Sequence, residues 1–178
     1  MKNIKLHDKE FEPYFSQEEV YGWINNLGSA ISKDYEGKTP IFIAILNGAF
    51  MFASDLMKKV TIDCEISFIK STSYQGTEST GTLNELIGLK ENIEGRHIII
   101  LEDIVDTGNS MVKTLESLKL KNPASIEICT MLFKPDAIEH QFPIKYIGKE
   151  IPNDFVVGYG LDYDGLGRII YSIMKLNA

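Results

Sequence analysis

Short apolar runs recur along the chain, and longer amphipathic segments separate them. The runs are rich in β-branched and aromatic residues, and most are apolar at consecutive positions. They occupy residues 41–46, 64–70, 96–103, 125–133 and 155–162. Strands that are apolar on both faces are typical of a parallel sheet that helices cover on both sides. The pattern therefore predicts an α/β fold built around a parallel β-sheet.

Three amphipathic segments have their apolar residues at helical spacing. The first follows Ser16, and Ser16 and Glu19 form the capping-box pattern that begins many helices. The other two start near Ala49 and near Ser110, each shortly after a predicted strand. Pro123 lies beyond the last segment and marks its end. The chain contains no internal repeat, low-complexity tract or linker, so we expect a single domain.

Composition and charge argue against several classes of protein. Apolar residues make up 44% and charged residues 24% of the chain, which is ordinary for a soluble globular domain. The formal net charge of −7 gives no support to nucleic-acid binding. The uncharged stretch at residues 40–54 is too short to span a bilayer, and the N-terminus has no apolar signal segment. Cys64 and Cys129 lack the spacing of metal or redox sites. We therefore expect a cytoplasmic protein with neither nucleic acid nor a membrane as partner.

The candidate chemistry lies in the segment ILEDIVDTGNSM at residues 100–111. Glu102, Asp103 and Asp106 stand at the end of a predicted buried strand, and ligands of parallel α/β sheets bind beyond the carboxyl ends of the strands. An ordinary helix cap would explain Asp106 or Thr107. It would not explain the adjacent like charges of Glu102 and Asp103, which repel unless something cationic or hydroxylated binds them. The vicinal hydroxyls of a ribose or a Mg²⁺ ion would serve.

A predicted anion site follows these carboxylates directly. Thr107, Gly108, Asn109 and Ser110 lead into a predicted helix. The first N–H groups of a helix have no intrahelical partners, and the helix dipole favours an anion there. Gly108 permits close approach of the backbone, and the two hydroxyls add donors. The segment therefore predicts a phosphate pocket that lacks a Walker lysine.

This segment resembles the phosphoribosyl-pyrophosphate motif of the type I phosphoribosyltransferases, where two acidic residues follow a buried strand and an Asp-Thr-Gly loop holds the 5-phosphate. Further segments resemble the hypoxanthine-guanine branch of that family, in order along most of the chain. LNGAF at 46–50 resembles the pyrophosphate loop, SYQGTESTG at 73–81 the mobile catalytic loop and FVVGYGLDY at 155–163 the purine-binding segment. Two single residues also match, Lys134 as the purine-contacting lysine and Arg168 as the pyrophosphate-binding arginine.

The resemblance implies a purine-salvage enzyme that requires Mg²⁺. Such an enzyme transfers the 5-phosphoribosyl group from 5-phosphoribosyl 1-pyrophosphate to hypoxanthine or guanine, and it yields IMP or GMP and pyrophosphate. The implied fold is a type I phosphoribosyltransferase-like sheet flanked by helices, in one domain over residues 1–178. A small hood would combine the N-terminal segment with residues from about 144 to 178, and a mobile loop would span about 71–84. The family also implies a homodimer or homotetramer.

The resemblance implies a role for each carboxylate of the motif. Asp106 would be the general base that faces the purine N7. Glu102 and Asp103 would bind the ribose hydroxyls and Mg²⁺, and Asp162 would hold a second magnesium ion through water.

The same resemblance implies how the other site residues divide between the parts of the substrates. Thr107, Gly108, Asn109 and Ser110 would hold the 5-phosphate. Asn47, Gly48 and Arg168 would bind pyrophosphate. Lys134, Phe155, Val156 and Asp162 would form the purine site, and Ser73 and Tyr74 of the mobile loop would close over the reacting centre.

Two asparagines depart from the family pattern, which often has a lysine at each position. Asn109 lies in the phosphate loop, where backbone N–H groups can still do most of the binding. Asn47 lies in the pyrophosphate loop, so Arg168 and magnesium would carry more of the charge neutralisation. The resemblance also implies a cis peptide between Leu46 and Asn47.

Lys134 gives a physical reason for the choice of base. Its ammonium group can only donate, which suits the exocyclic oxygen at C6 of a 6-oxopurine rather than the amino group of adenine. Without the motif, Lys134 would be interpreted as a solvated surface lysine and Phe155 as a core aromatic. The pattern leaves hypoxanthine, guanine and xanthine unranked.

Three rival interpretations fit less well. A phosphatase of the haloacid dehalogenase type requires Asp-x-Asp, whereas here two residues separate Asp103 from Asp106. A receiver domain requires an acidic pair after its first strand, and IFIAILNG at 41–48 supplies none. A non-catalytic nucleotide-sensing regulator on the phosphoribosyltransferase fold that binds RNA should carry a basic face, which the net charge of −7 disfavours.

Overall fold

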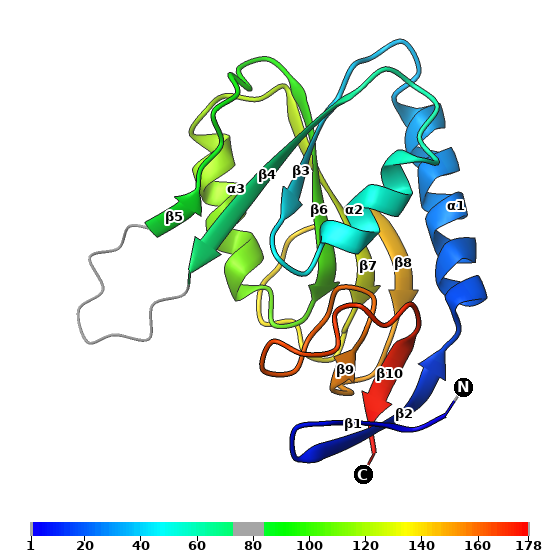
Figure 1. The fold of residues 1–178 in the computed structure, drawn as a ribbon. Coiled ribbons are helices and arrows are strands. Elements are labelled where there is room, and N and C mark those ends of the chain that lie inside the picture. Colours follow the sequence, from blue (N-terminus) through cyan, green and yellow to red (C-terminus); the bar gives the residue numbers. More distant parts are fainter. Residues whose placement is uncertain (1, 73–83, 178) are drawn as a thin grey trace.

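A mostly parallel sheet forms the centre of the protein (Figure 1). The computed structural model describes residues 2–72 and 84–177. Within them the central sheet has the strand order β5-β4-β3-β6-β7-β8, and all neighbours are parallel except the edge pair of β5 and β4. In chain order its strands are β3 (Ile41–Ile45), β4 (Glu65–Thr72), β5 (Asn84–Ile87), β6 (His97–Val105), β7 (Ser125–Phe133) and β8 (Tyr146–Glu150). The predicted α/β fold with a parallel sheet is confirmed.

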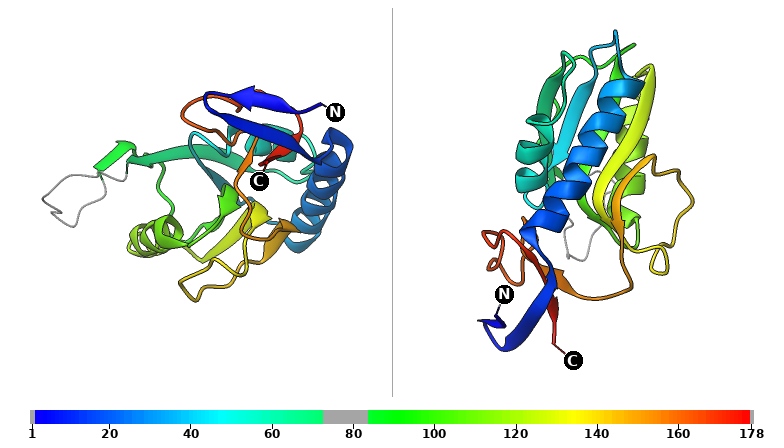
Figure 2. Two further views of the ribbon diagram at one scale, coloured as in Figure 1. Left: turned by 90° about the horizontal axis from the view of Figure 1, so that it is seen from below. Right: turned by 90° about the vertical axis from the view of Figure 1, so that its right-hand side faces the viewer.

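Helices cover both faces of this sheet, as the apolar pattern of the strands predicts. Alternate residues of β3 point to opposite sides, so Phe42 and Ala44 join one buried cluster while Ile41 and Ile43 join another. The helices α1 (Gln17–Asp34) and α2 (Phe50–Met57) contribute to the first cluster, and α3 (Asn109–Lys119) contributes Met111 and Leu118 to the second. Figure 2 shows these layers from two further sides.

The first helix begins with the predicted capping box. The hydroxyl oxygen of Ser16 accepts a hydrogen bond from the backbone N–H of Glu19 at 3.2 Å. The carboxylate of Glu19 accepts one in return from the backbone N–H of Ser16 at 2.8 Å. Two of the N–H groups at this helix end therefore have partners, and the prediction from the sequence is confirmed.

A smaller antiparallel sheet joins the two ends of the chain. It has the order β1-β2-β10-β9, with β1 (Ile4–Leu6), β2 (Lys9–Phe15), β9 (Val156–Val157) and β10 (Ile173–Leu176). In Figure 1 this sheet lies beyond the carboxyl ends of β6, β7 and β8. It is the hood that the resemblance implies, and it borders the edge at which ligands of parallel sheets bind.

The structure corrects the prediction of a strand at residues 155–162. In this run only Val156 and Val157 form a strand, and it belongs to the hood. Gly158, Tyr159 and Gly160 have φ angles of 97°, 49° and 99°, which turn the chain instead of extending it.

The sequence analysis also missed β8, the outermost parallel strand. Its sequence YIGKE is short and mixes apolar, small and charged residues, so its apolar signal is weak. This strand has a glycine at position 148 because no side chain would fit there: an added Cβ would lie 2.6 Å from the carbonyl oxygen of Met131 in the neighbouring strand. None of the helices in the described ranges is long and apolar enough to cross a membrane.

Candidate active site

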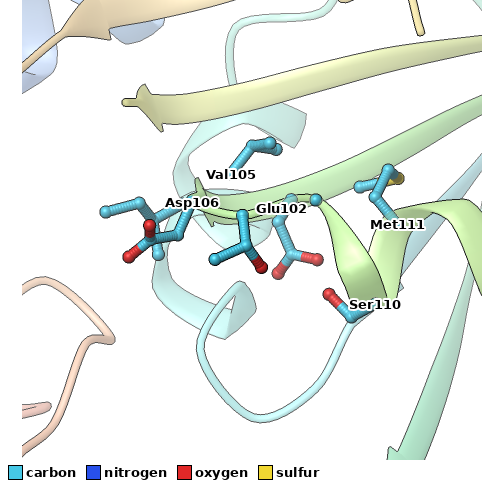
Figure 3. A pocket seen from close by; sticks show the side chains of 8 residues that line it. Glu102, Val105, Asp106, Ser110 and Met111 are labelled. Carbon is cyan, nitrogen blue, oxygen red and sulfur yellow. The ribbon is translucent and has the colours of Figure 1, made fainter. Parts of the chain in front are cut away.

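A pocket lies at the carboxyl end of β6, where the chain turns into α3 (Figure 3). Side chains from the end of the strand and from the first turn of the helix surround it, and Glu102 and Ser110 extend into it from these two elements. The lining residues are Glu102, Ile104, Val105, Asp106, Thr107, Gly108, Ser110 and Met111. The structure therefore brings together most of the residues of the predicted acidic and phosphate-binding segment.

The residue before α3 is a glycine, so the N-cap residue has no side chain to bond the first N–H groups of the helix. Gly108 is the N-cap residue, with φ 84°, and the one hydrogen bond recorded from a side chain of the loop is a long one, in which Oγ1 of Thr107 accepts from the backbone N–H of Asn109 at 3.5 Å. Neither Asp106 nor Thr107 is therefore the N-cap residue. Another residue at position 108 would be strained because φ is 84°, and its Cβ would also crowd Cδ1 of Ile138 at 2.8 Å and Cε1 of Phe142 at 2.9 Å. The loop presents backbone donors, as an anion site requires.

Two residues that match no motif hold Asn109 of this loop. Nδ2 of Asn109 donates to Oγ1 of Thr107 and to Oε2 of Glu139, each at 3.1 Å. Nε2 of His140 lies 2.6 Å from Oδ1 of Asn109. The backbone N–H of Glu139 also donates to the carbonyl of Thr107 at 2.9 Å. Sequence reasoning missed Glu139 and His140 because they lie 30 and 31 residues further along the chain from Asn109, in a segment without periodic pattern.

The acidic pair is buried at the end of β6. Glu102 is 7% and Asp103 is 9% exposed. Burial raises the pKa of Glu102 well above its usual range, and the negative charge of Asp103 raises it further. Burial also raises the pKa of Asp103, although a hydrogen bond from the backbone N–H of Ile104 to its Oδ1 at 2.9 Å favours the ionised form. The pair therefore offers a ligand carboxyl oxygens that are shielded from water.

The predicted pyrophosphate loop packs directly on this pair. A Cβ at Gly48 would overlap the carboxylate of Asp103, so only glycine allows this approach. The Leu46–Asn47 peptide is cis, which confirms the expectation from the resemblance. The backbone N–H of Leu46 donates to the carbonyl of Ile69 at 2.9 Å, which ties the loop to β4.

Arg168 reaches the same region from the chain that follows β9. Its Nη2 lies 2.6 Å from Oδ1 of Asp162, and its Nη1 donates to the carbonyl of Gly160 at 2.6 Å. A Cβ at Gly160 would overlap the carbonyl oxygen of Gly48. The structure therefore brings Gly48, Gly160, Arg168 and Asp162 into one continuous set of contacts.

Lys134 lies beside Asp106, although the two are far apart in sequence. Its Nζ is 2.7 Å from Oδ2 of Asp106 and 3.4 Å from Oδ1 of Asn153. Its backbone N–H donates to the carbonyl of Val105 at 3.0 Å, which fixes the lysine at the end of β6. Lys134 is only 6% exposed, so it is not a solvated surface lysine.

Phe155 differs from the core aromatic that its sequence context alone suggests. The residue is 42% exposed, and its ring lies 5.8 Å from that of Tyr163 and 6.2 Å from that of Phe11. Val156 is buried in β9, where it pairs with Lys175. The hood therefore offers an aromatic surface next to the strand that carries the predicted purine contact.

Mg²⁺ binds carboxylate oxygens, and the structure places two carboxylate groups, those of Glu102 and Asp103, next to each other at the end of β6. Glu102 and Asp103 fit an ion that takes one or two protein carboxylates and completes its shell with water and substrate phosphates. Asp162 does not group with them; Arg168 contacts its Oδ1, and the backbone N–H of Gly165 donates to its Oδ2. The described ranges contain no group of three or more His, Cys, Asp or Glu residues placed to hold a metal. Ser73 and Tyr74 lie outside the described residues.

Comparison with known proteins places this arrangement in a family. The family model named phosphoribosyl transferase domain matches residues 13–164 of this sequence. The chain belongs to the phosphoribosyltransferase family. A hypoxanthine-guanine phosphoribosyltransferase of Staphylococcus aureus is 39% identical over 164 residues, which are 92% of each chain. A hypoxanthine phosphoribosyltransferase of Haemophilus influenzae is 40% identical over 153 residues, which cover 83% of this chain and 85% of that one.

Solved structures of phosphoribosyltransferases share the fold. A hypoxanthine phosphoribosyltransferase from Staphylococcus aureus superposes with a TM-score of 0.87 at 39% identity, covering 93% of this chain and 91% of that one. The corresponding enzyme of Trypanosoma cruzi gives 0.85 at 31% identity, with 93% and 96% covered. These likenesses extend beyond the motif at the end of β6 to the whole arrangement of sheet, helices and hood.

Without Mg²⁺, replacing Glu102 by Gln is expected to stabilise the protein at neutral pH but not at pH 4. Since the folded pKa of Glu102 is raised, the folded protein holds a proton that the unfolded chain releases above the ordinary value of 4.5. The stability of the wild type therefore falls as the pH rises from that value toward the folded pKa. Glutamine does not ionise and escapes this loss. Thermal unfolding in EDTA across pH 4 to 8 measures the difference.

Glu116→Gln is the control for this series, because Glu116 is an exposed glutamate on α3. Its difference from the wild type should vary little with pH. If the midpoint of Glu102→Gln relative to the wild type were the same at pH 4 and pH 8, burial would not be raising the pKa of Glu102.

Proposed function

We propose that this phosphoribosyltransferase is a purine-salvage enzyme that acts on 6-oxopurines. It transfers the 5-phosphoribosyl group from 5-phosphoribosyl 1-pyrophosphate to hypoxanthine or guanine, giving IMP or GMP and pyrophosphate. The observation that carries the proposal is the contact between Lys134 and Asp106 at the end of the strand that bears the buried acidic pair. Relatives at 38–40% identity are named for hypoxanthine, guanine or xanthine, which supports the same substrate class.

The carboxylates of β6 and the loop that follows it orient the sugar phosphate. In this proposal the first N–H groups of α3 and the hydroxyls of Thr107 and Ser110 bind the 5-phosphate. Glu102 and Asp103 accept hydrogen bonds from the ribose hydroxyls and hold Mg²⁺. The anomeric carbon is then fixed between the pyrophosphate loop and Asp106. Such fixed geometry lowers the barrier, because the reactants need not be brought together from solution.

Asp106 and Lys134 act on the purine. Lys134 donates to the oxygen at C6 and thereby leaves its contact with Asp106, whose carboxylate then takes the proton of the purine N7. The ring of Phe155 stacks on the base from the hood, and the backbone of Val156 pairs with its edge. The C1–pyrophosphate bond breaks as the other imidazole nitrogen of the purine, N9, forms its bond to C1. Positive charge develops on the sugar and negative charge on the leaving pyrophosphate, so nearby cations lower the barrier.

The cations of the site neutralise the leaving group. We propose that Arg168, Asn47 and Gly48 contact pyrophosphate, and that Asp162 positions Arg168 and holds a second Mg²⁺ through water. Mg²⁺, when bound, offsets the charge of the pyrophosphate oxygens. A non-catalytic nucleotide sensor on the same fold gains no support from the relatives, which are named as enzymes.

We also propose that the protein is cytoplasmic, works as a single domain and associates as a homodimer or homotetramer. Phe50 on α2 and Ile66 and Phe68 on β4 are large apolar residues that remain exposed. Ile66 and Phe68 pair with Phe42 and Ala44 of β3, so they extend the face of the sheet that α2 covers. Exposed apolar residues that extend a core face are typical of subunit contacts.

The first prediction concerns the general base. Asp106→Asn should slow turnover with hypoxanthine about 10²–10⁴-fold, because a positioned base typically contributes that much. The KM for 5-phosphoribosyl 1-pyrophosphate should stay within about threefold of the wild type, since Asp106 contacts the purine and not the phosphates. Steady-state kinetics measure both values. Asp136→Asn, at an exposed aspartate, is the matched control, and near-wild-type turnover of Asp106→Asn would remove Asp106 from the role.

The second prediction concerns the choice of base. Pyrophosphate release should be observed with hypoxanthine or guanine and should depend on Mg²⁺, while adenine and uracil should give little, with xanthine assayed alongside. Adenine would set its amino group against the ammonium of Lys134, and an unsatisfied buried donor costs about 1–3 kcal/mol, or about 5–150-fold. Lys134→Gln should reduce the difference between the rates of pyrophosphate release with hypoxanthine and with adenine. Equal use of adenine by the wild type would refute the proposed preference.

The third prediction concerns association. Phe68→Asp should reduce the mass measured by light scattering, because it places a charge on the exposed apolar face. Leu120→Asp is the matched control, since Leu120 is also exposed but lies just beyond the end of α3. If the wild type were monomeric at micromolar concentration, or if both variants associated like the wild type, the proposed contact face would be wrong.

A further inference from the structure

Lys70 lies beside the pyrophosphate loop, in a position that no motif marks. It follows Ile69 on β4, and the carbonyl of Ile69 accepts the hydrogen bond from Leu46 that ties the loop to this strand. Nζ of Lys70 is 3.1 Å from Oδ1 of Asn47. An ammonium group can only donate, so the amide oxygen of Asn47 must face it. The Nδ2 group of Asn47, which can donate to an anion, is therefore turned away from the lysine.

The charge of Lys70 is not neutralised by a carboxylate in the described ranges. The two other cations of the site are paired there, Lys134 with Asp106 and Arg168 with Asp162. Lys70 has no carboxylate oxygen within the 4.0 Å limit of an ion pair among those residues, and its contact with Asn47 joins it to an uncharged group. Lys70 thus adds a full positive charge to a site in which carboxylates otherwise surround the cations.

This charge lies next to the place where a polyanion would bind. Asn47 is followed by Gly48, which packs on the carboxylate of Asp103 and whose carbonyl packs on Gly160. Arg168 donates to the carbonyl of Gly160 from the other side. Lys70 and Arg168 therefore approach the loop through different neighbours. Two cations around one loop of backbone donors favour a ligand with several negative charges.

We propose that Lys70 is a pyrophosphate-binding residue, which supplies from β4 the positive charge that Asn47 lacks. The inference rests on the proposed function and deepens it, because it adds a residue to the pyrophosphate part of the site. Lys70 contacts the phosphate oxygens directly, and its hold on the amide oxygen of Asn47 directs the Nδ2 donors of that side chain toward the same anion.

The test compares three substitutions that separate charge from hydrogen bonding. Lys70→Arg keeps the charge and the donors, Lys70→Gln keeps a donor but no charge, and Lys70→Met keeps neither. The Kd for pyrophosphate with Mg²⁺ is measured by calorimetry, and the KM values for 5-phosphoribosyl 1-pyrophosphate and hypoxanthine by steady-state kinetics. Lys119→Gln, at an exposed lysine at the end of α3, controls for the loss of net positive charge.

We expect Lys70→Gln and Lys70→Met to raise the Kd for pyrophosphate and the KM for 5-phosphoribosyl 1-pyrophosphate about tenfold or more, as for a lost hydrogen bond to a charged group. Lys70→Arg and Lys119→Gln should stay within about threefold of the wild type, and the KM for hypoxanthine should change little in every variant. Thermal unfolding identifies any variant that fails to fold. In the Lys70→Gln background, Asn47→Lys should recover much of the lost affinity, because it returns the charge to the loop.

The outcomes separate this inference from the function it rests on. If the wild type binds pyrophosphate and turns over hypoxanthine while Lys70→Gln matches it in both constants, Lys70 is only a structural partner of Asn47 and the inference is wrong. The same conclusion follows if Asn47→Lys restores nothing to a weakened Lys70→Gln. If the wild-type protein neither binds pyrophosphate nor releases it from 5-phosphoribosyl 1-pyrophosphate, the proposed function fails and this inference fails with it.

Discussion

The burial of two adjacent carboxyl groups at the end of β6 is the constraint on which the rest of the site depends. Glu102 and Asp103 are almost completely removed from water, and desolvation works against the ionisation of both. A fold gains nothing in stability from such a pair, since well-packed apolar residues would fill the end of this strand at lower cost. The pair is therefore best understood as a ligand site whose cost is offset by the large apolar core on both faces of the sheet.

Glycines set how closely the other parts of the site can approach this pair. Gly48 lets the loop after β3 lie on Asp103, and Gly160 lets the chain after β9 lie on Gly48. Gly108 does the same for the segment of Ile138 and Phe142. In each case a single added carbon would overlap or crowd its neighbour, which is the carboxylate of Asp103 at Gly48, a backbone carbonyl at Gly160 and two apolar side chains at Gly108, so close packing sets the spacing of the loops. This rigidity suits a site that must hold a phosphate, a sugar and a base in one alignment.

The sequence predicts best those features that are local. The run of β3 is continuously apolar, those of β6 and β7 are mostly apolar, and the capping box of Ser16 and Glu19 spans one turn, so these features could be recognised from neighbouring residues. The acidic pair and the phosphate loop are contiguous for the same reason. β8 was missed because a short edge strand with Gly148 and Lys149 has no clear period. The run at 155–162 was misassigned because its apolar residues surround three consecutive positive-φ positions, 158–160, which the apolar pattern does not reveal.

Contacts between residues far apart in the sequence could be recognised only in the folded structure, and they show how the charged side chains of the site are paired. Lys134 is bonded to Asp106 across 28 residues, Lys70 to Asn47 across 23 and His140 to Asn109 across 31. No spacing rule could predict these pairs, because they arise from the parallel register of neighbouring strands and from the loops that follow them. Each joins a residue of the recognised motifs to a partner on another segment. Lys134 is the buried member of these pairs, and within the described ranges no buried side-chain nitrogen or oxygen lacks a hydrogen-bond partner. A purine that draws Lys134 away from Asp106 must offer its ammonium group an acceptor in exchange, so a base without that acceptor leaves a buried donor without a bond.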